Sequence, residues 1–211
     1  AMVGINSGAP KANVGEVKAS GFDGNFALKH KFGPVRLTLR GNITYSKNEI
    51  LEYDEEYTVY GYKQYAGHRI NQARGLIALG LFKDYDDIRN SPKQTFGDYM
   101  PGDIKYKDVN GDGVIDGNDV CAIGATTKPN LTYGFGFSVN WKGLDFNAHF
   151  QGVGKSTYFI NGSTVYMFST SDGWGNVLKD MAYGSRWISR EISGTEATED
   201  VNAAYPRLSY G

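Results

Sequence analysis

The sequence has few of the side chains that build disulfide or metal-bound scaffolds. Among its 211 residues there is one cysteine, Cys121, and there are three histidines, His30, His68 and His149. A single cysteine excludes an intramolecular disulfide framework, and histidines this far apart do not have the spacing of a zinc site. Cys121 is therefore predicted to be a small, packed side chain.

Neither sign of charge dominates the sequence. The formal net charge is −1, only 21% of the residues are charged, and the lysines and arginines are dispersed along the chain. A protein that binds nucleic acid usually gathers its basic residues on one stripe or face. We therefore expect no nucleic-acid partner.

Long apolar runs and catalytic motifs are also missing. No run of 18 apolar residues occurs, so no membrane-spanning helix is predicted, and residues 1–4 lack the charged and apolar regions of a secretory signal. The segment Gly152–Thr157 resembles a phosphate-binding loop but has His149 where that loop requires its first glycine. Neither a Gly-x-Ser-x-Gly elbow nor a His-Glu-x-x-His helix occurs. The chain is predicted not to be an enzyme, and any export signal is expected elsewhere.

What the sequence does contain favours strands. It has 28 glycines and 14% aromatic residues, a composition that suits β-structure better than helices. Four segments alternate between apolar and polar side chains, which is the pattern of a strand with two different faces. We predict strands at residues 22–32, 35–46, 131–141 and 144–153, joined in pairs by the short turns Gly33-Pro34 and Lys142-Gly143.

The lengths of these strands and of their connections indicate the kind of sheet. Each strand has about 10 residues, the length that crosses a hydrocarbon layer at a tilt. Alternation alone fits a soluble β-sandwich equally well. The turns are minimal, however, whereas residues 47–130 and 155–211 form long connections, as the outer loops of membrane barrels do. The predicted fold class is all-β, with antiparallel strands of a transmembrane β-barrel and long extracellular loops.

The first long connection has some organisation of its own. The apolar run Gly75–Phe82 is expected to pack within the loop. Asp84 is expected to cap a short helix that runs through Ile88 and Arg89, because its carboxylate can accept from the backbone N–H three residues on. Pro92 prevents the helix from continuing.

An acidic, oxygen-rich loop occupies residues 108–119. It follows the calcium-loop pattern D-x-[DN]-x-[DN]-G-x₅-E, except that an aspartate stands in the last place. Calcium takes about six to eight oxygen ligands. The candidates are the side chains of Asp108, Asn110, Asp112, Asp116 and Asp119 and the carbonyl of Val114. The sequence predicts a structural Ca²⁺ ion here, although its Asp-Gly and Asn-Gly steps also suit an ion-free polar loop.

Several motifs taken together resemble a known family. They are Pro101–Asp119, Ile123-Gly124, Pro129, Tyr133-Gly134-Phe135 and Phe150–Gly154, preceded by Asn13–Val17, Gly21-Phe22-Asp23 and Gly80-Leu81-Phe82. In these motifs the chain resembles the SusC/RagA family of TonB-dependent outer-membrane transporters. The resemblance runs from about Asn13 to at least Gly154.

The resemblance implies that residues 1–211 are a partial β-barrel domain from the C-terminal half of such a receptor. The whole barrel would have about 22 strands and a plugged lumen. Implied with it are the outer membrane of a Gram-negative cell, contact with outer-membrane lipid, energy from the TonB complex through parts absent from this sequence, and a SusD-like lipoprotein partner. The implied function is import of glycan oligosaccharides or peptides. The alternative left open is a secreted, calcium-stabilised β-sandwich binding module.

Five residues are candidates for ligand contact. Trp174, Trp187 and Tyr99 lie in the long loops, where an aromatic ring can serve as a platform for a sugar. Arg36 and Arg40 lie on the polar phase of a predicted strand and are expected to face the lumen. Most loop aromatics are expected only to pack, and the two arginines could equally pair with carboxylates of a plug.

Overall fold

The computed structural model describes residues 13–161, 167–168 and 177–209. The chain forms two compact units, which we describe separately. The first contains the described residues up to Gln72 together with Ala125–Thr157. The second contains Ala73–Gly124 together with the described residues from Tyr158 onward.

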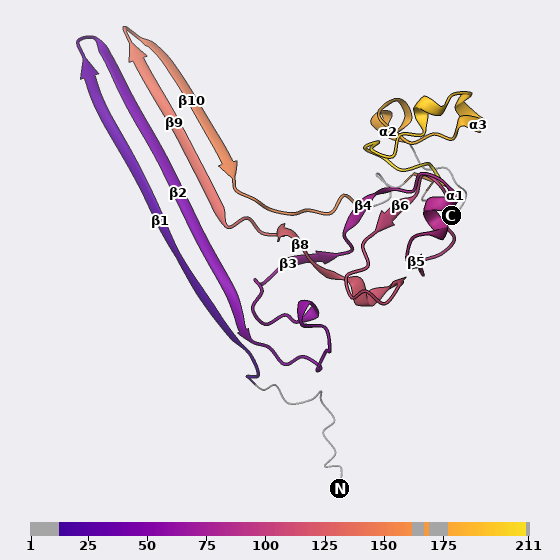
Figure 1. Ribbon diagram of the computed structural model, residues 1–211. Helices are drawn as coiled ribbons and strands as arrows, with labels where there is room; N and C mark the ends of the chain where they lie inside the picture. Colours follow the sequence, from indigo (N-terminus) through magenta and orange to yellow (C-terminus); the bar gives the residue numbers. More distant parts are fainter. Residues whose placement is uncertain (1–12, 162–166, 169–176, 210–211) are drawn as a thin grey trace, which may run out of the picture. The chain divides into compact units, whose positions relative to one another are not determined.

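Figure 1 labels most of the elements of both units. The strands are β1 (Glu16–Phe32), β2 (Val35–Glu52), β3 (Gln72–Gly75), β4 (Ala78–Leu81), β5 (Lys93–Gln94), β6 (Ile104–Tyr106), β7 (Val114–Ile115), β8 (Cys121–Thr126), β9 (Leu131–Trp141) and β10 (Leu144–Val153). The α-helices are α1 (Tyr85–Arg89), α2 (Lys179–Tyr183) and α3 (Arg190–Ser193). The 3₁₀ helices are η1 (Gly61–Lys63), η2 (Gly117–Asp119) and η3 (Glu196–Thr198).

The first unit is built on a four-stranded antiparallel sheet in the order β1-β2-β9-β10 (Figure 1). Its two hairpins are joined by the pairing of β2 with β9, in which Val35 lies opposite Trp141 and Tyr45 lies opposite Leu131. Hairpins that are adjacent in the sheet therefore come from segments far apart in the sequence.

Both hairpin turns have the backbone that a twisted strand pair needs. Lys142 and Gly143 have φ angles of 48° and 88°, the positive values at both central positions that characterise a type I′ turn. In the other hairpin, Gly33 has a φ of 58° and is followed by Pro34, which suits a type II′ turn. These turns fix the register of each hairpin, and with it the face on which every side chain lies.

The strand bounds agree with the sequence prediction in the second hairpin and extend beyond it in the first. β9 and β10 have the predicted bounds, but β1 begins at Glu16 instead of residue 22, and β2 ends at Glu52 instead of residue 46. In the extension, Lys18 and Ser20 occupy the phase that Phe22 begins as apolar, so alternation ends there. The strand continues because pairing uses the backbone, and Val17 still lies opposite Ile50.

The second unit contains short strand pairs and a short helix. β4 pairs with β6 and β5 with β7, and Phe82 and Ile115 are fully buried. α1 spans Tyr85–Arg89, and its N-cap Asp84 accepts a 2.8 Å hydrogen bond from the N–H of Asp87, which confirms the predicted capped helix. Within the described ranges, no helix has the length and apolarity needed to span a membrane.

A two-stranded ribbon is formed by β3, which precedes β4 to β7 in the sequence, and β8, which follows them. Cys121, at the start of β8, is buried and has its Sγ 3.9 Å from the carbonyl oxygen of Gly75. The prediction that this cysteine is a small packed side chain is therefore confirmed.

Candidate functional site

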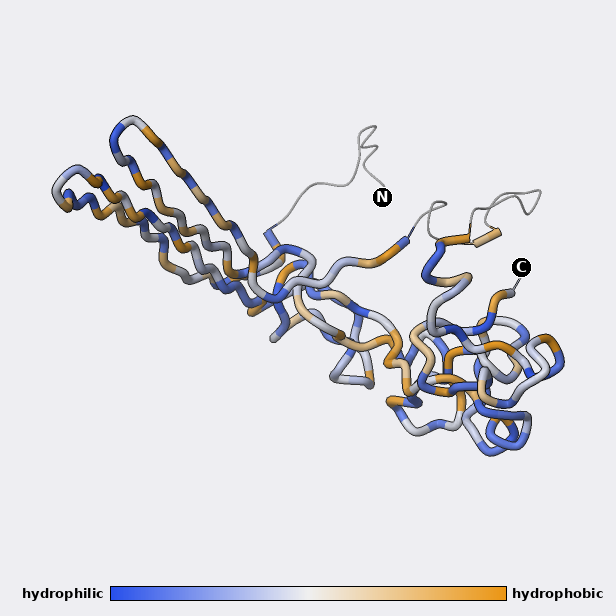
Figure 2. Tube along the Cα trace, turned by 90° about the horizontal axis from the view of Figure 1, so that it is seen from above, coloured by the Kyte–Doolittle hydropathy of each residue, from blue (hydrophilic) through white to orange (hydrophobic). Residues whose placement is uncertain are grey.

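The sheet of β1, β2, β9 and β10 has one continuous apolar face. Register places apolar or small side chains in rows across the four strands, such as Leu28–Leu39–Phe137–Ala148 and Phe26–Gly41–Phe135–Phe150. Figure 2 shows the resulting alternation of hydropathy along each strand. Several of these side chains, including Phe26, Phe135 and Phe150, are at least half exposed, at 57%, 53% and 50%.

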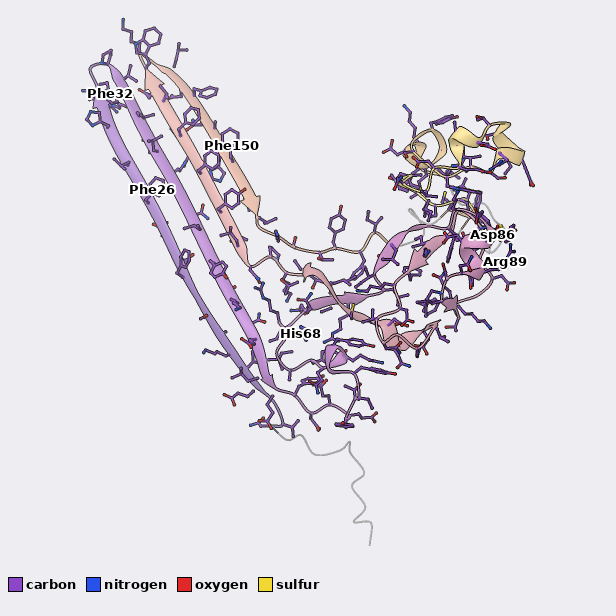
Figure 3. All side chains as sticks on the ribbon, in the orientation of Figure 1. Phe26, Phe32, His68, Asp86, Arg89 and Phe150 are labelled. Atoms are coloured by element: carbon purple, nitrogen blue, oxygen red, sulfur yellow. The ribbon has the colours of Figure 1, made fainter. Side chains whose placement is uncertain are left out.

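This exposure decides between the two folds that alternation allowed. A β-sandwich buries its apolar phase between two sheets, whereas the apolar phase of this sheet is open. Figure 3 labels three of its aromatic residues, Phe26 and Phe32 on β1 and Phe150 on β10. The strands are those of an antiparallel β-barrel, and the sandwich alternative does not fit them.

The apolar face has the height of a membrane barrel's apolar band. It extends along β1 from Phe22 to Phe32, which at about 3.4 Å per residue and a tilt of about 45° gives a height of about 25 Å. At the turn end lies Trp141, with the ammonium of Lys142 5.7 Å from its ring centre. At the other end lie Tyr45 and Tyr133. Trp and Tyr are the residues that collect at membrane–water interfaces.

Aromatic rings cover two glycines of this face, Gly41 and Gly152. A Cβ added to Gly41 would lie 2.5 Å from the ring of Phe26, and one added to Gly152 would lie 2.5 Å from the ring of Tyr133. A ring laid over a bare backbone in this way fills the space that the glycine leaves. Phe135 and Phe150 also stack, with ring centres 5.0 Å apart, so the apolar face is continuous.

The opposite face of the sheet is polar and holds two of the candidate ligand residues. Arg36 lies directly opposite Lys31, and both are exposed. Arg40 lies four residues further along the strand on the same face and donates a 3.4 Å hydrogen bond to the hydroxyl of Ser138. Sequence placed Arg36 and Arg40 on the polar phase, and the register puts them on this face.

The 108–119 loop is held together by its own side chains. The carboxylate of Asp108 accepts from the N–H groups of Gly111 and Gly113, at 2.6 and 2.8 Å. Asp119, with no exposed surface, accepts from Val109 and Asp116, at 2.7 and 2.8 Å. Asp116 accepts in turn from the N–H of Asn118, so Asp116 and Asp119 form a capping box on η2.

The remaining candidate ligands of this loop make similar bonds. Asn110 accepts from the N–H of Asp112, and Asp112 accepts from the N–H of Val114. Throughout the part of the chain that the structure describes, no three acidic, histidine or cysteine side chains lie close enough to hold a metal ion. Backbone N–H groups of the loop therefore already bond to side-chain oxygens of Asp108, Asn110, Asp112, Asp116 and Asp119, and calcium binding stays a prediction.

The three aromatic candidates have different environments. Trp187 is only 5% exposed, and its ring lies against Gly102, where a Cβ would overlap it. Tyr99 stacks on Phe82 with ring centres 5.4 Å apart, and its hydroxyl oxygen accepts from the N–H of Gln94 at 3.3 Å. Trp174 lies outside the described residues.

Sequence reasoning missed a cavity in the second unit. It has a volume of about 610 Å³ and is lined by residues of several segments, which include Tyr85 at the start of α1, Met100, Trp187 and Leu208. No single motif marks it, because its lining residues extend along the sequence from Lys83 to Leu208. Trp187 was singled out as an aromatic, but nothing in the sequence indicated what lies beside it.

An ion pair beside α1 gives the second unit a measurable pH dependence. The ammonium of Lys105 lies 2.7 Å from the Asp87 carboxylate, with about a quarter of each side chain exposed. This hydrogen bond, together with the N–H of Lys83, lowers the pKa of Asp87 despite some desolvation. A lowered folded-state pKa contributes stability that is present above the unfolded pKa and lost as the pH falls through the folded value.

We therefore expect Lys105→Met to raise the pKa of Asp87 and to make residues 83–106 open at a higher pH during acidification. Proteolytic cleavage of this segment, followed from pH 5 down to pH 2, measures the change. Arg89→Met is the control, because it removes only the exposed pair that Arg89 forms with Asp86. Identical acid profiles for Lys105→Met and the parent protein would contradict the expectation.

No protein-family model matches the sequence. Over 117 residues, 51% of the chain, it is 29% identical to TonB-dependent receptor P26 of Formosa agariphila, of which the match covers 12%. In a structure of the RagAB peptide transporter, 20% of one chain matches 93% of this chain, with a TM-score of 0.59 and 18% identity. A structure of the RagAB peptide importer in its closed-closed state matches 68% of this chain and 16% of its own, with a TM-score of 0.47 and 18% identity.

The chain thus spans only about an eighth to a fifth of the length of these proteins. The sequence match is to a TonB-dependent receptor, and the fold is that of part of a RagAB transporter chain. The predicted resemblance to TonB-dependent receptors is thus confirmed by the sequence match, and the match to the RagAB transporter chain shows a shared fold.

Proposed function

We propose that this chain is part of an outer-membrane transporter that imports a nutrient. The observation that carries the proposal is the two-faced sheet. One face presents an apolar band about 25 Å high that suits lipid, and the other presents Arg, Lys, Asn and Gln side chains that suit a wet lumen. The likeness to a TonB-dependent receptor supports the same function.

The proposal extends to the cargo and to the partner proteins. The transported nutrient is a glycan oligosaccharide or a peptide, and the fold shared with a peptide transporter favours the peptide. A SusD-like lipoprotein covers the outer side, and the TonB complex supplies energy through parts of the receptor outside this sequence. The chain has no catalytic role and binds no nucleic acid.

The proposed topology places the short turns at Gly33-Pro34 and Lys142-Gly143 in the periplasm and the long connections outside the cell. Tyr57, 91% exposed in the first long connection, and Lys142, in a turn, are suitable reporter positions. In the full-length receptor, Tyr57→Cys is expected to react with a membrane-impermeant maleimide on intact cells, whereas Lys142→Cys reacts only after the outer membrane is opened.

The parent protein is the control for Cys121, which is buried and is expected to stay unlabelled. Labelling of both positions on intact cells, or recovery of the receptor in the soluble fraction, would contradict the proposed topology. Import itself is tested by deleting the receptor gene and measuring growth on peptides and on oligosaccharides as sole carbon sources. Unchanged growth on both would argue against import.

We further propose that the 108–119 loop binds Ca²⁺ in a structural role. Only the sequence pattern of oxygen ligands supports this, and binding requires Asp108 and Asp112 to turn from the loop amides toward the ion. Calcium is then expected to slow amide exchange across the loop in the parent receptor and to have little effect in Asp112→Asn. The proposal fails if calcium leaves exchange in the parent unchanged.

A further inference from the structure

The cavity of the second unit has the size of a ligand site. Its volume of about 610 Å³ lies within the range of about 300–1,000 Å³ that pockets for small ligands occupy. One wall is the start of α1, the helix whose Asp86 and Arg89 are labelled in Figure 3. The other walls come from the residues that precede β6 and from the segment around Trp187.

Much of the lining is apolar. The side chains that form this part are Tyr85, Met100, Pro101, Trp187, Ile188 and Leu208. The ring of Trp187 is held in place by Gly102, whose φ of 89° and missing Cβ let the backbone approach the ring closely. A rigid aromatic wall of this kind can bury an apolar group of a ligand with little loss of side-chain entropy.

Several of the charged residues around the cavity are neutralised within the protein. Arg190 forms ion pairs with Glu196 and Glu199. Both carboxylates belong to η3 and its C-cap. Arg207 pairs with Asp103.

Two cations of the lining are not neutralised in this way. Lys83 and Arg186 each line the cavity, and neither has an acidic side chain within ion-pair distance in the ranges that the structure describes. Among the described residues, the other charges that line the cavity are Asp84, which caps α1, and Glu191. The cavity therefore offers two cations that no carboxylate of the described residues pairs with.

Two buried donors of residues that line the cavity also lack a partner within the part of the chain that the structure describes. The Nε–H of Arg186 and the indole N–H of Trp187 are both buried, and both lack an acceptor among the described residues. Buried donors without a partner are uncommon in folded proteins, because each carries a desolvation cost. An acceptor oxygen brought to these donors, with a small adjustment of the two side chains, would satisfy them.

We propose that this cavity binds a ligand with an apolar body and a carboxylate, the carboxylate lying between Lys83 and Arg186 and the apolar body against Trp187 and Met100. Charge-assisted hydrogen bonds to a carboxylate are about twice as strong as those to a neutral group. That the ligand is imported cargo rests on the proposed function. That the cavity binds such a ligand does not depend on transport.

Matched dipeptides test the proposal in the full-length receptor held in detergent. The probes are N-acetyl-Leu-Phe as its free acid and as its C-terminal carboxamide, titrated by calorimetry. The acid is expected to bind about tenfold more tightly than the amide. Arg186→Gln and Lys83→Gln each reduce this preference, and the double substitution brings the two affinities within about twofold of each other. Arg89→Gln, on the exposed side of α1, leaves the preference unchanged.

A steric variant keeps the test valid if the arginine substitution unfolds the segment. Met100→Trp fills the cavity without changing charge and is expected to weaken both probes by about tenfold or more. The proposal is overturned by equal binding of acid and amide to the parent, by no binding of either, or by an acid preference that survives the double substitution. Because no transport is involved, a receptor that imports nutrients but shows none of this preference refutes the cavity proposal alone.

Discussion

Replacement of Leu39 by arginine is expected to destabilise the folded barrel by about 2–4 kcal/mol, because it places a charge near the middle of the apolar band. Leu39 lies on β2, a central strand of the sheet, between Leu28 and Phe137. It is about equally far from the two ends of the band that Phe22 and Phe32 mark along β1. An arginine side chain there cannot easily reach either membrane interface.

Thr38→Arg is the matched control, since Thr38 is the neighbour of Leu39 on the polar face. It is expected to change stability little, because its side chain extends toward the wet side of the sheet. Urea unfolding of the full-length receptor in lipid vesicles measures both variants. Equal destabilisation of the two would mean that the apolar face does not meet lipid.

Asp119→Ala is expected to open the 108–119 loop at a cost of about 2–5 kcal/mol. The carboxylate has no exposed surface and accepts from the N–H groups of Val109 and Asp116. Without it, two part-buried donors lose their acceptor, and each loss costs about 1–3 kcal/mol. The measurement is amide exchange of residues 104–121 in the intact receptor, without added calcium.

The control for this prediction is Asp112→Ala, because Asp112 is exposed and water can replace its bonds to Val114 and Asn110. It is expected to change exchange by a small factor. If the two alanine variants behave alike in the absence of calcium, the buried carboxylate is not what holds the loop.

Alternation predicted those parts of the sheet in which the two faces meet different solvents. It located β9 and β10 and the turn ends of β1 and β2, and through register it placed Arg36 and Arg40 on the polar face. It missed the extensions from Glu16 and to Glu52, where Lys18 and Ser20 occupy the phase that is apolar further along, while the apolar Val17 and Ile50 lie on the other phase. The six short strands from β3 to β8 were not predicted, because a strand of so few residues does not show a clear alternation.

The 108–119 loop shows how one pattern can have two physical meanings. Asp116 and Asp119 are spaced as calcium ligands, and they are also spaced as the two members of a capping box. The sequence contains both signals: the structure shows the capping box, and calcium binding stays a prediction. The cavity beside Trp187 gave no signal in the sequence, because only the tertiary fold brings its separate segments together.

The β3–β8 ribbon has a consequence for the order in which the sheet can assemble. The seam between β2 and β9 closes over the entire segment between Tyr45 and Leu131, and the entropy cost of closing a loop rises with its length. The β3–β8 ribbon, extended by the hydrogen bond from the N–H of Thr127 to the carbonyl of Asn71, holds residues near position 72 next to residues near position 126. Once it forms, only short stretches remain to be closed, so we expect the β1–β2 and β9–β10 hairpins to form early and to join only after the ribbon has paired.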